Sequence, residues 1–108
     1  MQGFWTVQFS GVHGWGAGVL TLIGGQVFGG DTSFLYIGTY SEEGNTMKGR
    51  VHVKRHAVGM PNVMGRDEFD LELIGTLNGN VMTINARIPG THLQLSGTLT
   101  KQGDIPPR

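Results

Sequence analysis

The sequence predicts an all-β fold, a single antiparallel up-and-down β-barrel of eight strands. Apolar and polar residues alternate along most of the chain, as in strands with one buried face, and helical periodicity is almost absent. Short turns rich in glycine separate the alternating segments, so neighbouring strands are expected to run antiparallel. The 108 residues are enough for one domain with one modest core.

The strands are expected, in chain order, at residues 2–9, 15–22, 26–28, 33–41, 46–56, 68–74, 81–88 and 93–99. The fourth is rich in aromatic and β-branched residues, which favour strands. The second closes at a Gly24-Gly25 turn. Asn78-Gly79 is the strongest hairpin signal, because both residues tolerate the positive φ of a type I′ turn. The longest connection covers residues 57–67.

Strands joined in sequence by hairpins can remove both sheet edges by closing into a barrel. A β-sandwich is the competing architecture, but it needs longer Greek-key connections than this chain offers. Glycines within the strands permit the bends of a small barrel; they include Gly16, Gly18, Gly38, Gly49 and Gly97. The barrel is expected to span residues 1–102. Residues 103–108 should form an extended tail, because two prolines disfavour a helix there.

The composition excludes several classes of protein. Lys and Arg number 8, as do Asp and Glu, so the net charge is zero and a broadly basic nucleic-acid binder is not expected. There is no cysteine, hence no disulfide or thiol chemistry. No signal peptide and no apolar run long enough for a membrane span are visible, so a cytoplasmic protein is expected. Only 15% of the residues are charged, which favours association, including self-association.

No metal or cofactor site is expected from the histidines. His52 and His56 are four residues apart, and on a strand this spacing separates their Cα atoms by about 13 Å. Such a distance is too large for both side chains to bind one ion. His13 and His92 have no partner pattern in the sequence, so all the histidines are interpreted as surface residues.

One strand carries a basic stripe on its polar face. The stripe consists of Lys48, Arg50, His52 and Lys54. It could follow a phosphate backbone, but no aromatic residue alternates with it to stack on bases. The next strand carries an acidic stripe of Glu68, Asp70 and Glu72. If the two strands are neighbours, the stripes form a ladder of opposite charges, and this interpretation is favoured over nucleic-acid contact.

The sequence contains no recognisable arrangement of catalytic residues, and the chain is expected not to be an enzyme. The glycine-rich segments lack the spacing of a phosphate-binding loop, and no nucleophile elbow is present. The longest loop contains three large apolar residues, Met60, Val63 and Met64. Two interpretations stay open: the loop plugs one end of the barrel, or it forms a lid or contact surface.

A series of short motifs resembles known small barrels. Gly3-Phe4-Trp5 resembles the Gly-x-Trp that opens the first strand of lipocalin-type barrels. The motifs that follow in order are Gly24-Gly25, Gly29-Gly30-Asp31, Tyr36-x-Gly38, Ser41-Glu42 and Pro61-Asn62-Val63. The series resembles the GrlR family, small bacterial barrels named for a negative regulator of type III secretion gene expression. The likeness extends roughly from Gly3 to Leu73.

This resemblance implies a lipocalin-like barrel, a homodimer and an apolar interior. It also implies contact with a transcriptional activator through an acidic run, Glu-Asp-Glu-Asp. In this chain only Glu42 and Glu43 match that run.

Two functional hypotheses follow. The first is a regulatory protein that acts by protein–protein contact through Glu42, Glu43, Met60, Val63 and Met64. Its homodimer would be formed by the outward residues Phe4, Leu35 and Ile37. The second is a carrier or sensor of a small apolar ligand. The cavity that holds this ligand would be lined by Trp5, Val7, Tyr36, Val51, Phe69, Leu71, Met82, Ile84, Leu93 and Leu95. Inward glycines would leave room for it. A lipocalin-like enzyme is a third hypothesis.

Overall fold

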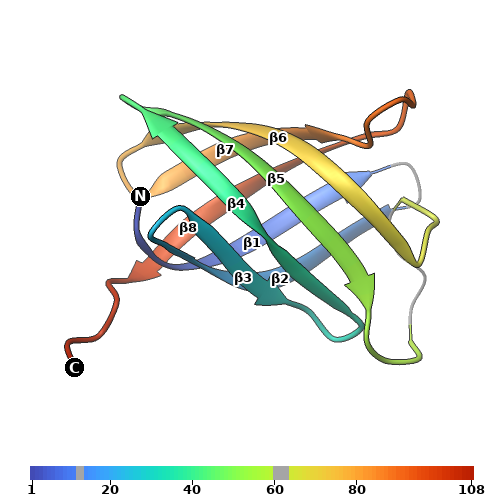
Figure 1. Ribbon diagram of the computed structural model, residues 1–108, viewed down its shortest axis with the longest axis horizontal. Helices are drawn as coiled ribbons and strands as arrows, with labels where there is room; N and C mark the ends of the chain where they lie inside the picture. Colours follow the sequence, from blue (N-terminus) through green and yellow to red (C-terminus); the bar gives the residue numbers. More distant parts are fainter. Residues whose placement is uncertain (12–13, 60–63) are drawn as a thin grey trace.

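The computed structural model describes residues 1–11, 14–59 and 64–108. Across these residues the chain forms eight antiparallel strands and no helix, and the strands close into one barrel in sequence order (Figure 1). They are β1 (Gly3–Gly11), β2 (Gly14–Ile23), β3 (Gln26–Gly30), β4 (Phe34–Glu43), β5 (Thr46–Arg55), β6 (Glu68–Asn78), β7 (Val81–Arg87) and β8 (Gln94–Gly103). The predicted fold class, an up-and-down barrel of the lipocalin-like kind, is confirmed.

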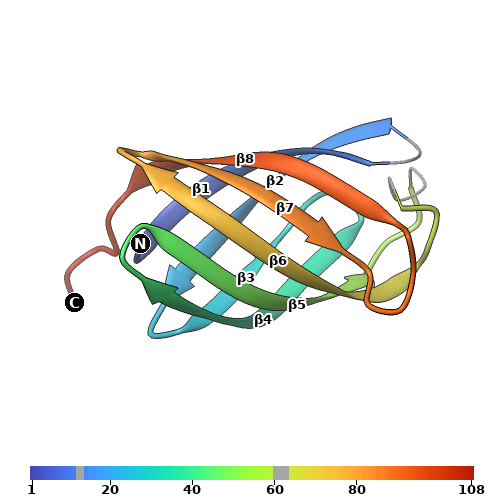
Figure 2. The same cartoon turned by 90° about the horizontal axis from the view of Figure 1, so that it is seen from above.

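Pairing of the first and last strands closes the barrel. Thr6 lies opposite Thr100, and the register shifts between Phe4 and Trp5. The closed wall is visible from above in Figure 2, with β8 running beside β1. A sandwich would leave separate sheets with free edges, so the competing architecture is excluded.

The barrel has two distinct ends. At one, here called the terminal end, the chain starts, β8 finishes, and the β2–β3, β4–β5 and β6–β7 hairpins turn (Figure 1). At the other, here called the loop end, lie the β3–β4 connection, the long connection after β5 and the β7–β8 connection. Residues 104–108 leave the terminal end without regular secondary structure.

The hairpin turns contain the glycines that the sequence indicated, but one turn lies one residue later than predicted. Gly24 and Gly25 both have positive φ, as a two-residue type I′ turn requires. The β6–β7 turn was predicted at Asn78-Gly79, but Asn78 pairs with Val81 as the last residue of β6. The turn residues are therefore Gly79 and Asn80, of which only Gly79 has positive φ, a backbone conformation that costs glycine least.

The core lies inside the barrel. Successive residues of a strand point to opposite faces, so every second side chain of β7 is buried and the others are exposed. The largest fully buried side chains are Trp5, Leu22, Met64 and Met82. Met64 belongs to the long connection at the loop end, so the structure favours the interpretation of this connection as a plug.

Candidate functional site: an apolar cavity inside the barrel

The barrel interior is not completely filled. A cavity of about 80 Å³ lies among side chains that point inward. Its lining residues are Val7, Phe9, Leu20, Leu22, Val27, Tyr36, Met47, Val51, Val53, Phe69, Leu71, Leu73, Ile84, Leu95 and Leu99. Apart from the hydroxyl of Tyr36, these side chains are apolar. Apolar cavities favour hydrocarbon groups over water.

Most residues predicted to line a cavity do so, namely Val7, Tyr36, Val51, Phe69, Leu71, Ile84 and Leu95. Trp5 and Met82 are buried but lie outside the lining, near the start of their strands at the terminal end. Leu93 is half-buried and precedes β8 at the loop end. The remaining lining residues were missed as site residues. Extending the alternation by two positions from Val51 would have found Val53, and the same step from Leu71 would have found Leu73.

The inward glycines do not create this cavity, contrary to the expectation from the sequence. A Cβ atom at Gly18 would lie 2.8 Å from the hydroxyl oxygen of Tyr36. At Gly75 it would lie 2.7 Å from the sulfur of Met82. Neighbouring side chains therefore occupy the space that these glycines leave, and the free volume lies among the larger side chains of the lining.

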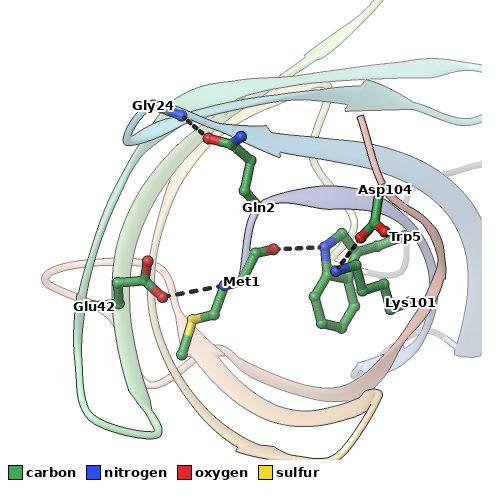
Figure 3. A network of polar contacts seen from close by, with 7 residues as sticks. All are labelled: Met1, Gln2, Trp5, Gly24, Glu42, Lys101 and Asp104. Atoms are coloured by element: carbon green, nitrogen blue, oxygen red, sulfur yellow. Dashed lines mark hydrogen bonds and ion pairs between the residues drawn. The ribbon is translucent and has the colours of Figure 1, made fainter. Parts of the chain in front are cut away.

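The terminal end is closed by the start of the chain (Figure 3). The side chain of Met1 is buried, and its amino group lies 3.4 Å from a carboxylate oxygen of Glu42. The indole Nε1 of Trp5 donates a hydrogen bond to the carbonyl oxygen of Met1 at 3.0 Å. The backbone N–H of Gly24 donates to the side-chain oxygen of Gln2 at 3.2 Å. These contacts hold Met1 over the barrel interior.

A polar cluster supports the cavity wall on the β3–β4 side. Asp31 accepts hydrogen bonds from the backbone N–H groups of Ser33 at 2.9 Å and Phe34 at 2.8 Å. The hydroxyl of Tyr36 donates to the other carboxylate oxygen of Asp31. Burial, together with this hydrogen bond to a carboxylate, raises the pKa of Tyr36 above its ordinary value. The side chain of Tyr36 is therefore a neutral phenol, and its hydroxyl donates a hydrogen bond to Asp31.

Of the described residues predicted to contact a protein partner, Met64 does not share a surface with Glu42 and Glu43. Glu42 and Glu43 end β4 at the terminal end. Met64 lies on the connection at the loop end and is only 2% exposed, so it belongs to the core. Met60 and Val63 lie outside the described residues. The acidic pair and Met64 thus lie at opposite ends of the barrel.

The residues predicted for the dimer do share one surface. Phe4, Leu35 and Ile37 point outward from β1 and β4. Between these strands, Val19 on β2 and Phe28 on β3 are also exposed. Phe28 lies directly opposite Ile37, and Thr21 links Phe28 to Phe4 across the sheet. We call Phe4, Val19, Phe28, Leu35 and Ile37 the outer apolar face.

The predicted charge ladder is confirmed. The neighbouring pairs on β5 and β6 are Lys54 with Glu68, His52 with Asp70, and Arg50 with Glu72. Arg50 lies 3.8 Å from Glu72, and both side chains are exposed, so this pair adds little stability. The ring of His52 makes closer contacts: Nδ1 lies 2.7 Å from Asp70 and Nε2 lies 2.6 Å from Glu68.

This geometry predicts a pH dependence of stability that depends on His52. Both carboxylates can only accept hydrogen bonds, so both ring nitrogens must donate, and the ring is an imidazolium. Hydrogen bonds to Asp70 and then to Glu68 raise its pKa above 6.5. A group whose pKa is higher in the folded state than in the unfolded state contributes its full stabilisation at pH values below its unfolded-state pKa. This contribution is lost as the pH rises through its folded-state pKa.

We therefore expect the His52→Gln variant to lose more stability relative to the parent at about pH 6 than at about pH 9. Urea unfolding of both proteins at the two pH values measures this difference, and an NMR titration of the ring reports its pKa. A loss of equal size at both pH values would contradict the imidazolium assignment.

No group of three or more His, Asp or Glu side chains within the described ranges is arranged to hold a metal ion. Comparison with known proteins gives no further assignment. No protein-family model matches the chain, and no curated protein matches it. Among residues 1–11, 14–59 and 64–108, no helix is long and apolar enough to cross a membrane.

Proposed function

We propose that this chain is a non-enzymatic binding protein that holds a small apolar ligand inside its barrel. The observation that carries the proposal is the cavity of about 80 Å³ with a predominantly apolar lining. One water-sized group needs roughly 10–15 Å³ on the same scale, so the cavity has room for several such groups. It is smaller than the ~150 Å³ apolar cavity that binds benzene, which favours a short alkyl group over a ring.

A titration with dissolved butane tests this proposal. Butane should change the ¹H–¹³C methyl shifts of Val51, Ile84 and Leu95, which line the cavity. The Val51→Phe variant should not respond, because the larger side chain fills the space. If that variant does not fold, Val7→Leu is a milder substitution at another lining position. Unchanged methyl shifts in the parent protein at saturating butane would overturn the proposal.

A second candidate is a regulatory protein that acts through protein–protein contact as a homodimer, as the GrlR resemblance implies. The outer apolar face favours it, because large apolar side chains gathered on an exposed surface mark interaction sites. A symmetric dimer would bury the same patch on both copies. Each large apolar side chain that becomes fully buried contributes roughly 1.5–3 kcal/mol before the cost of association is subtracted.

Replacing Ile37 by lysine tests this dimer. Ile37 is 54% exposed on β4, directly opposite Phe28 in the outer apolar face, and a charge there should give a folded monomer by light scattering. Ile74→Lys is the matched control, since Ile74 is 55% exposed on β6, away from that face, and its replacement should leave assembly unchanged. A parent protein that is monomeric at high concentration would remove the dimer hypothesis.

A further inference from the structure

We infer that the barrel selects an uncharged, hydrocarbon-like ligand and rejects both carboxylate and ammonium analogues of the same molecule. The inference rests on the proposed function, since it concerns the ligand of the same cavity. It follows from the chemistry of the cavity wall and of the polar cluster beside it.

A charged ligand group would need a partner of opposite charge in the cavity lining. Among the described residues that line it, none is Lys, Arg, His, Asp or Glu. On β5, Arg50 and His52 point to the opposite side of the wall, where they contact the acids of β6. Arg55 follows the inward alternation of β5, but its guanidinium stacks on Phe34 and pairs with Asp67, and it is not among the lining residues. A charged ligand group in the cavity would therefore have no counter-ion in the lining, and burial of an unpaired charge is costly.

The hydroxyl of Tyr36 is the one hydrogen-bonding side-chain group among the described lining residues. Its proton is donated to Asp31, so it has no donor left for an anionic ligand. Asp31 itself is held by the backbone N–H groups of Ser33 and Phe34 and does not need a ligand to complete its contacts. A carboxylate that approached this part of the wall would meet an acceptor backed by a negative charge.

A cationic ligand would also find no partner in the cavity lining. An ammonium group could be attracted by Asp31, but Asp31 is not among the lining residues, whereas Tyr36, which donates to it, is. The rings of Tyr36 and Phe9, both in the lining, pack nearly perpendicular to each other with centroids 6.5 Å apart. The lining thus presents these aromatic rings and no carboxylate, so an ammonium group in the cavity would also stay unpaired.

A matched series of four-carbon probes tests this selectivity by methyl NMR: butane, 1-butanol, butyrate and butylammonium. We expect butane and 1-butanol to shift the methyl signals of Val51, Ile84 and Leu95. Butyrate and butylammonium should bind at least about 100-fold more weakly than 1-butanol. The Ile37→Lys variant should give the same results, which shows that the probes do not act through the outer apolar face.

The outcomes separate this inference from the proposed function. Butyrate or butylammonium binding within tenfold of 1-butanol would overturn the selectivity but leave the cavity as a binding site. Absence of binding by every probe, butane included, would overturn the proposed function and the inference together. Weak binding confined to the charged probes would also contradict the selectivity, because these are the molecules that the wall should reject.

Discussion

Replacing Trp5 by alanine is expected to lower the free energy of unfolding by about 3–5 kcal/mol, the usual cost of removing a large buried aromatic side chain. Trp5 is 1% exposed and closes the terminal end of the barrel. Its Nε1 also donates to the carbonyl oxygen of Met1, so the variant loses a hydrogen bond as well as packing. Urea unfolding monitored by circular dichroism measures the loss.

Trp15→Ala is the matched control for this prediction. Trp15 is 77% exposed near the start of β2, and its replacement should change stability by no more than about 0.5 kcal/mol. Equal losses in the two variants would contradict the assignment of Trp5 to the core.

The second large effect is expected at Gly38, where alanine should destabilise the protein by about 3 kcal/mol, the upper part of the range for overpacking. A Cβ atom there would lie 2.8 Å from the Cα of Val51 and 2.9 Å from the backbone carbon of Arg50. Because these are backbone atoms of the neighbouring strand, the clash cannot be relieved by a side-chain rotation. Thermal or urea unfolding of the variant tests the prediction.

Gly103 provides the control for Gly38. A Cβ atom at Gly103 would meet no atom within 4 Å. Gly103→Ala should therefore leave stability nearly unchanged. If Gly38→Ala were equally harmless, β4 and β5 could not pair as closely as the structure shows.

The fold was predictable because its main signal is local. Period-two alternation assigns each strand a buried face, and this holds the register of neighbouring strands. The charge ladder shows how far such reasoning extends. Since β5 and β6 are adjacent antiparallel strands, Arg50 faces Glu72 and His52 faces Asp70. The strong β6–β7 turn signal was nevertheless placed one residue early, because a glycine can take the positive φ without help from Asn78.

The site was less predictable because it depends on how side chains from opposite walls fill the interior. Gly18 suggested free space, yet the ring of Tyr36 occupies it. The link between Tyr36 and Asp31 joins a strand residue to a turn residue, and no period in the sequence reveals it. Met64 also could not be assigned, since an apolar residue in a long loop either covers the core or stays exposed.

Diffraction from a crystal pressurised with xenon tests the central claim, a hollow apolar barrel interior, most directly. Xenon enters dry apolar cavities and scatters strongly. We expect one xenon site inside the barrel, in contact with Val51, Ile84 and Leu95. Electron density showing an interior filled by protein side chains, with no xenon within the barrel at saturating pressure, would contradict it.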